Sequence, residues 1–164
     1  MRADVYEKFF SHEGSHWWFV AREKILDSLL NRHLGAKKTN ALDIGSGPGM
    51  NVSLVEKHAE RMVCLEPSAE AISLAKQKFP GLITLRGAFP ETRPEEQFDL
   101  ITMFDALEHM EDDHAALVAA QSLLYPGGHL VITVPAFMFL WSEHDDHVYH
   151  KRRYTKKELT SALA

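Results

Sequence analysis

The sequence has a single cysteine, Cys64, among its 164 residues, so no disulfide can form within the chain. Proteins without disulfides are typical of reducing compartments. Positive charge is not in excess either, because 18 Lys and Arg residues stand against 23 Asp and Glu residues, and the net charge is -5. General nucleic-acid binders are usually basic. The composition therefore predicts a protein without a nucleic-acid partner.

Long apolar runs are absent as well. The longest, LVITVPAFMFLW, covers 12 residues and is interrupted by Pro135. A helix needs about 20 apolar residues to cross a bilayer. The first ten residues, MRADVYEKFF, lack the basic-then-apolar order of a secretory signal. These features predict a cytoplasmic protein with no transmembrane segment.

The chain does have a regular alternation of strand-like and helix-like segments. Helices are expected at 22–34, 52–60, 68–79 and 111–125, and strands at 40–44, 61–66, 81–87, 98–104 and 129–135. In the first helix, one apolar face is expected to comprise Ile25, Leu26, Leu29, Leu30 and Leu34. Such alternation predicts parallel strands joined by right-handed crossovers. Because no repeat or linker divides the chain, we expect one α/β domain over residues 1–164.

The stretch ALDIGSGPGM, residues 41–50, places three alternating glycines directly after a predicted buried strand. Gly45, Gly47 and Gly49 accept a positive φ and carry no Cβ, so a ligand can pack against the main chain there. Dinucleotide sites use G-x-G-x-x-G, but here Met50 occupies the place of the last glycine. Asp43, just before the turn, favours a ligand with a positive group over a pyrophosphate. A tight turn without a ligand is the alternative interpretation.

Glu66 ends the next predicted strand, 23 residues after Asp43. This is near the spacing at which an acidic residue meets the ribose hydroxyls in nucleotide-binding folds. A carboxylate can accept hydrogen bonds from both hydroxyls. Alternatively, Glu66 is a solvated acid at a strand end. Together, Asp43, the glycines and Glu66 predict a nucleoside ligand with a cationic, amino-acid-like tail.

Four segments resemble the successive motifs of class I S-adenosylmethionine-dependent methyltransferases: ALDIGSGPG, LEPS, FDLITMFDALEHMED and LLYPGGHLVITVP. The resemblance covers about residues 40–135. The flanks, HWWFVARE and LWSEHDDHVYHKRRYTKKEL, resemble one bacterial branch that is associated with glycan or small-metabolite modification. The resemblance implies a Rossmann-like doubly wound sheet, order 3-2-1-4-5, with helices on both faces. It implies S-adenosylmethionine as cofactor and S-adenosylhomocysteine as product.

The resemblance also implies roles for individual residues. The methionine portion of the cofactor would face Asp43, Gly45, Ser46, Gly47 and Gly49, and the adenosine would lie near Glu66, Pro67, Ala88 and Phe89. Glu66 would meet the ribose. The family often has an acidic residue where this sequence has Ala88. Phe104 and Asp105 would pass beside the sulfonium.

Aromatic residues and a histidine complete the expected site. The segment before the first helix would form a lid or a packed flap, with Trp17 and Trp18 near the site and Arg22 near the methionine carboxylate. His109 is the candidate general base, since a neutral imidazole accepts a proton at cytoplasmic pH. The alternative is that His109 orients Asp105 or the loop. The run AFMFLW (136–141) is expected to form a substrate pocket or lid.

The segment SEHDDHVYHKRRY contains residues with metal-ligand chemistry, namely His144, Asp145, His147 and His150. The matching family segment is not known as a metal site, so no metal is expected. Acceptor recognition is the favoured interpretation, through His144, Asp145, His150, Arg152, Arg153 and Tyr154. The basic cluster of Lys151, Arg152, Arg153, Lys156 and Lys157 would meet an anionic group or form a solvated helix start.

The expected organisation is a helical flap (1–35), a cofactor-binding core (36–135), and a substrate-side loop with the start of a helix (136–164). The family fold has two further strands, so the chain is expected to be truncated, with a free fifth-strand edge that could support oligomerisation. The predicted function is methyl transfer to a small-molecule, lipid-linked or glycan acceptor. The alternatives are a nicotinamide-dependent oxidoreductase and an inactive cofactor-binding module.

Overall fold

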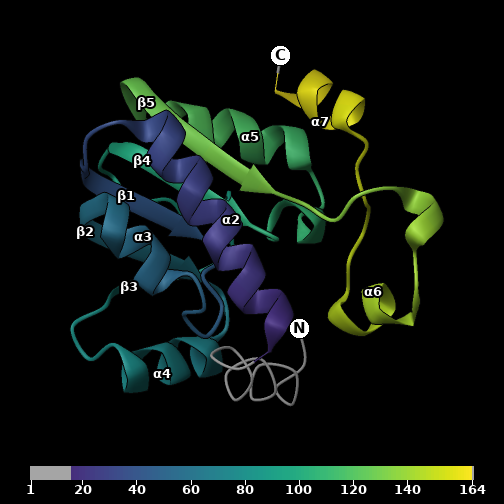
Figure 1. Cartoon of the computed structure of the whole chain (residues 1–164), viewed down its shortest axis with the longest axis horizontal. Coiled ribbons are helices and arrows are strands. Elements are labelled where there is room, and N and C mark those ends of the chain that lie inside the picture. The colour runs from purple at the N-terminus through teal and green to yellow at the C-terminus, as the bar shows by residue number, and fades with distance from the viewer. Residues whose placement is uncertain (1–15, 164) are drawn as a thin grey trace.

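The computed structural model describes residues 16–163, in which helices and strands alternate along the chain (Figure 1). The helices are α2 (Trp17–Leu34), α3 (Val52–His58), α4 (Ala69–Lys78), α5 (Asp113–Ser122), α6 (Glu143–Val148) and α7 (Lys156–Ala162), with short 3-10 helices η1 (Leu107–His109) and η2 (Met138–Leu140). The strands are β1 (Lys38–Ile44), β2 (Ala59–Glu66), β3 (Ile83–Arg86), β4 (Phe98–Phe104) and β5 (Leu124–Thr133). Residues 1–15 of the expected flap lie outside the described residues.

The strands form one parallel sheet in the order β3-β2-β1-β4-β5, which confirms the predicted fold class. β1 lies at the centre and pairs Asp43 with Cys64 of β2 and with Thr102 of β4. The strand order reverses between β1 and β4. In open parallel sheets, ligands bind at such a reversal, beyond the carboxyl ends of the strands.

Helices cover both faces of the sheet because successive strand residues point to opposite faces. Leu42 and Ile44 pack in the cluster that includes α5 and part of α7, whereas Ala41 packs in the cluster that includes α2, α3 and α4. Figure 1 shows α2 and α3 in front of the sheet and α5 at the β5 end. Two apolar cores thus hold the strand ends, and the loops beyond them, in fixed positions.

The first described helix differs from the prediction in its start and its buried face. α2 begins at Trp17 rather than at residue 22. It buries Leu26, Leu30 and Leu34, one row at a spacing of four residues, and leaves Ile25 61% and Leu29 46% exposed. The five residues predicted to form one apolar face are therefore divided: three are buried, and Ile25 and Leu29 face outward.

Two other boundaries also differ. The helix predicted at 52–60 ends at His58, and β2 begins at Ala59. The helix predicted to end at Tyr125 ends at Ser122, and β5 begins at Leu124 and runs through the Pro-Gly-Gly sequence. Phe98 pairs with Leu124 while Leu100 pairs with His129, so β5 takes up the extra residues in a bulge. The turn signal in the sequence is accommodated inside the strand.

The chain beyond β5 extends past the carboxyl end of the sheet and returns (Figure 1). An isolated parallel bridge between Ala136 and Tyr154 closes this excursion, which contains η2 and α6. In the run 136–141, predicted to form a substrate pocket or lid, Phe139 is 81% exposed and stacks on Phe137. None of the helices described for residues 16–163 is long and apolar enough to cross a membrane.

Candidate functional site

A cavity of about 750 Å³ lies at the carboxyl ends of the strands, at the reversal of strand order. This volume is typical of small-molecule sites. Its wall includes eight of the residues singled out from the sequence: Gly45, Gly47, Glu66, Pro67, Ala88, Phe89, Asp105 and His109. The tertiary structure thus brings the ends of β1, β2, β3 and β4 around one space.

The glycine turn takes the conformation that its sequence predicts. Gly45, Gly47 and Gly49 have φ values of 74°, 55° and 91°. A Cβ at Gly45 would lie 2.7 Å from the Cβ of Ala106, so a side chain there would collide with the loop after β4. A Cβ at Gly47 would meet no atom within 4 Å in the described chain. Gly47 therefore leaves open space for a ligand at the cavity wall.

Glu66 is buried at the end of β2 and anchors this turn. Its Oε2 accepts a hydrogen bond from the Gly47 N–H at 2.9 Å, and its Oε1 accepts one from the Ser68 N–H at 2.9 Å. A carboxylate has about four lone-pair sites, so these two bonds are compatible with accepting ligand hydroxyls too. The carboxylate thereby holds the glycine turn and the start of α4 in place while it lines the cavity.

Asp43 is buried within β1, directly before the glycine turn. Its Oδ1 accepts a 2.6 Å hydrogen bond from the Thr102 hydroxyl, and its Oδ2 has no hydrogen-bond partner among residues 16–163. Burial raises the pKa of Asp43 to about 7, although the Thr102 hydrogen bond and the Arg22 charge oppose this. A cationic ligand group nearby would favour the charged carboxylate.

Arg22 joins α2 to the ends of β4 and β5. Its Nη2 donates to Asp105 Oδ2 at 2.5 Å and to Thr133 Oγ1 at 3.1 Å, and its guanidinium lies over the Phe104 ring, 5.7 Å from the centroid. Nη1 donates to Asn51 Oδ1. Arg22, Phe104 and Asp105 are thus held in one group. Asp105 lines the cavity that residues 16–163 form, whereas Arg22 and Phe104 do not.

The two tryptophans of α2 lie on the surface. Trp17 is 72% exposed and Trp18 is 53% exposed, and their rings meet edge to face at 5.9 Å. Neither lines the cavity described for residues 16–163, and the predicted positions Asp43, Ser46 and Gly49 also do not. A Cβ at Gly49 would lie 3.2 Å from Ala75 Cβ, so this glycine permits close packing of α4.

The segment predicted to recognise an acceptor is largely engaged within the protein. Asp145 is buried and accepts hydrogen bonds from Arg153 Nε and Nη2, both at 2.8 Å, and its Oδ1 lies 2.8 Å from His150 Nδ1. The Tyr154 hydroxyl is buried and donates to Asp113 Oδ2 at 2.8 Å. The polar groups of these side chains already bond to other groups of the protein. Their predicted contacts with an acceptor stay predictions. His144 is exposed.

The basic cluster is also paired. Lys151 contacts Glu111, Arg152 contacts Asp113 at 2.9 Å, and Arg153 contacts Asp145. The first two pairs attach the returning segment to the start of α5 and the loop before it, and the third lies within the segment. Three of the five residues of the predicted basic cluster therefore form ion pairs within the protein.

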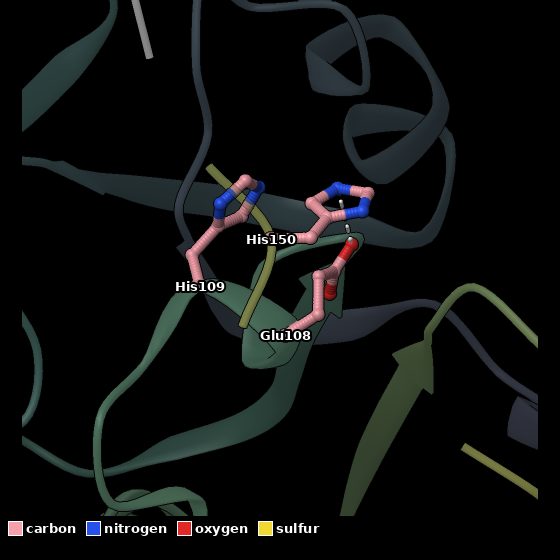
Figure 2. Close-up of side chains that lie close together, drawn as sticks. All are labelled: Glu108, His109 and His150. Carbon is pink, nitrogen blue, oxygen red and sulfur yellow. Dashed lines mark ion pairs between the residues drawn. The ribbon is translucent and has the colours of Figure 1, made fainter. Parts of the chain in front are cut away.

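Figure 2 shows Glu108, His109 and His150 lying close together. Glu108 is completely buried, and burial raises its pKa to about 8. Burial and the neighbouring His150 lower the pKa of His109 to about 4. The imidazole of His109 is therefore neutral near pH 7, and it lines the cavity.

Part of the cavity wall was not predicted: Ile44, Leu65, Pro90, Glu91, Met110, Glu111, Asp112 and Ala115. Four of them, Ile44, Leu65, Pro90 and Met110, are immediate neighbours in sequence of predicted residues. Lys151, which was predicted only as part of the basic cluster, also lines the cavity, and no neighbouring residue in the sequence indicates this position. It reaches the wall because its segment pairs with Glu111, 40 residues away.

We expect the wild-type protein to become less stable as pH rises because Asp43 is buried, and Asp43→Asn to lack this pH dependence. A carboxyl whose pKa is raised by folding binds more protons in the folded than in the unfolded state, so stability falls as pH rises from about 4 through 7. Between pH 5 and 8 this effect amounts to about 2–3 kcal/mol for a shift of this size. Urea unfolding at both pH values measures it. Glu56→Gln, an exposed acid on α3, should keep the wild-type slope, and an equal slope in Asp43→Asn would contradict the assignment.

Sheet order, glycine turn and cavity together define a Rossmann-like α/β protein with a site for a nucleoside-containing ligand. A family model described as a methyltransferase domain matches residues 18–163. The chain therefore belongs to this methyltransferase family, which confirms the resemblance to class I S-adenosylmethionine-dependent methyltransferases. The likeness of the two flanks to one bacterial branch stays a prediction.

Comparisons with individual proteins agree with this family. A probable S-adenosylmethionine-dependent methyltransferase of Mycolicibacterium smegmatis is 23% identical over 151 residues, covering 90% of this chain and 58% of that protein. The N-methyltransferase NodS from Bradyrhizobium japonicum, in complex with S-adenosylhomocysteine, superposes with a TM-score of 0.76 at 20% identity, covering 98% of this chain and 83% of that one. CalS10 from Micromonospora echinaspora, an amino pentose methyltransferase with bound S-adenosylmethionine, gives 0.68 at 23% identity, covering 84% and 59%. The chain thus spans little more than half of two of these relatives.

Proposed function

We propose that this domain binds S-adenosylmethionine in the cavity and transfers its methyl group to a small-molecule acceptor. The observation that carries the proposal is the buried Glu66 carboxylate on the cavity wall, bonded to the N–H of Gly47 in the glycine turn. Family membership supports the same reaction class. It favours methyl transfer over the nicotinamide-dependent alternative.

The residues present fit this cofactor. Gly47 leaves open space at the wall. Asp43, buried directly before the glycine turn and not part of the wall, would act on a bound ammonium group through its charge rather than by contact. Glu66 is placed to accept the ribose hydroxyls, while Ala88 and Phe89 offer apolar surface beside the adenine. When bound, S-adenosylmethionine supplies an already activated methyl group. The protein then has to hold the acceptor in line and exclude water.

We propose that His109 accepts the proton that the methyl acceptor loses. Its side chain lines the cavity and is neutral near pH 7, because burial and His150 lower its pKa to about 4. A neutral imidazole can take a proton from a hydroxyl or ammonium group as the methyl bond forms. Asp105, held by Arg22, lies on the same wall. This pair would set the position of the loop that faces the reacting atoms.

Acceptors of this domain are proposed to be small molecules, including lipid-linked and glycan compounds. The support comes from similar proteins, one of which is an amino pentose methyltransferase. In the described structure three of the predicted substrate residues, Asp145, Arg153 and Tyr154, are bonded within the protein. We therefore propose that His109 and Met110, which line the cavity, contact the acceptor.

Titration calorimetry with S-adenosylhomocysteine and with NAD⁺ tests the proposed cofactor. We expect one equivalent of S-adenosylhomocysteine to bind and NAD⁺ to show no saturable heat. Native mass spectrometry of freshly purified protein should show a retained mass of the methyl donor or its demethylated product. Saturable NAD⁺ binding without S-adenosylhomocysteine binding would overturn the proposal. Binding without turnover on any acceptor panel would favour the inactive binding module.

A further inference from the structure

Three side chains with metal-ligand atoms converge beside the cavity (Figure 2). Glu108 and His109 belong to η1, and His150 follows α6 about 40 residues later in the chain. One ligand atom from each lies within 4.8 Å of the other two. The Lys151 N–H donates to the Glu108 carbonyl at 2.9 Å, so the backbone itself holds the two segments together.

Both histidines have one ring nitrogen beside an acceptor, which leaves the other for a ligand. His150 Nδ1 lies 2.8 Å from Asp145 Oδ1, and Arg153 holds that carboxylate in its charged form. His109 Nδ1 lies 3.4 Å from the Tyr149 carbonyl oxygen. Acceptors at Nδ1 favour the proton on that nitrogen and place the lone pair on Nε2. Metal-binding histidines are oriented in this way by carboxylates and carbonyls.

Glu108 supplies a second, independent observation. Its side chain is fully buried, and neither carboxylate oxygen has a hydrogen-bond partner among residues 16–163. His150 Nε2 lies 3.6 Å from Oε1, too far for a hydrogen bond. Two ligands at about 2.1 Å from a tetrahedral ion are about 3.4 Å apart. An ion between Glu108 and His150 would therefore satisfy a buried carboxylate that the fold otherwise leaves unpaired.

We propose that Glu108, His109 and His150 bind a divalent transition-metal ion of the zinc class. Two imidazoles and one carboxylate form a ligand set used for such ions when a further coordination position stays open. His109 lines the cavity, so the open position faces the proposed acceptor site. The site's role in methyl transfer rests on the proposed function. There, the ion would lower the pKa of an acceptor hydroxyl so that its proton passes to solvent water, and His109 would act as a metal ligand and not as the proton acceptor.

Binding of Zn²⁺ and Co²⁺ to chelator-treated protein tests the site. We expect one equivalent of Zn²⁺ to bind by calorimetry, and Co²⁺ to give the visible absorption of a four- or five-coordinate site. Glu108→Gln and His109→Ala should each weaken Zn²⁺ binding by at least about 10-fold. The matched control is His147→Ala, an exposed histidine of α6 whose Nδ1 contacts the Glu143 carbonyl, and it should bind as the wild type does.

Several results would overturn the site. The wild type could fail to bind one equivalent, or the His147→Ala variant could lose as much affinity as Glu108→Gln, which would indicate adventitious surface binding. Circular dichroism and thermal unfolding of each variant show whether it is folded. Glu108→Gln is nearly isosteric, so it tests the carboxylate without opening space. S-adenosylhomocysteine binding to the same chelator-treated protein separates this inference from the proposed function, because either one can then fail alone.

Discussion

Replacing Glu66 with glutamine should lower the affinity for S-adenosylhomocysteine by about 100-fold, because the carboxylate accepts from two backbone N–H groups at once. A glutamine amide has one acceptor oxygen and one NH₂ donor. Its NH₂ would face the N–H of either Gly47 or Ser68, donor against donor. The glycine turn would shift, and a ribose acceptor would be lost.

The magnitude follows from the kind of bond that is removed. A hydrogen bond to a charged group contributes about 1.5–3 kcal/mol, and about 1.4 kcal/mol corresponds to a tenfold change in affinity. Loss of one anchoring bond together with one ribose bond therefore reaches about 100-fold or more. Titration calorimetry measures the change directly.

Glu70→Gln is the matched control for this prediction. Glu70 lies in the first turn of α4, four residues from Glu66, and is exposed. We expect its affinity for S-adenosylhomocysteine to stay within about threefold of the wild type, since surface changes of this kind are worth about 0.5 kcal/mol or less. If Glu66→Gln folds normally and binds as tightly as Glu70→Gln, the ribose assignment is wrong.

Replacing Asp145 with alanine should lower the free energy of unfolding by about 3–5 kcal/mol, because it leaves its buried partners without a counter-charge. Arg153 and His150 are 14% and 10% exposed in their side chains, and both contact the Asp145 carboxylate at 2.8 Å. The Ser142 N–H donates to it as well. The Arg153 guanidinium holds the pKa of Asp145 well below its usual range. Urea unfolding at neutral pH measures the loss.

The neighbouring acid on α6 provides the control. Asp146 is exposed and accepts a 3.0 Å hydrogen bond from Trp141 Nε1. Asp146→Ala should cost less than about 1 kcal/mol, as an exposed polar contact does. A loss from Asp145→Ala no larger than this would show that the buried pair contributes little, and that the segment is held by its apolar contacts alone.

The sheet and the glycine turn were predictable because their signals are local. Period-two apolar runs and capped helical runs alternate along the chain, and this pattern predicts parallel strands whatever the distant residues are. The strand-Asp-x-Gly pattern predicted where Gly45 and Gly47 bend the chain, and both have positive φ values. The buried face of α2 was predicted less well, because Ile25 and Leu29 are as apolar as the residues that meet the sheet.

The C-terminal segment shows the limit of that approach. Its histidines and acids have metal-ligand and acceptor-binding chemistry in any fold, so the sequence favoured ligand recognition. In the structure, Asp145 pairs with Arg153, and Tyr154 pairs with Asp113, 41 residues away. Pairing over such a distance has no periodicity to reveal it. Which polar group meets a ligand and which meets another side chain is decided only when the segments pack.

By itself, the sequence determined the α/β class, the bare turn at 45–49 and the acid at position 66, because each depends on a few neighbouring residues. The tertiary structure alone decided that Arg22 meets Asp105, that Asp145 is buried, and that His150 lies beside Glu108. The first and the last of these contacts join residues that are 83 and 42 positions apart. They exist because two apolar cores bring the strand ends together, and a charge then pairs with whatever group the packing places within reach.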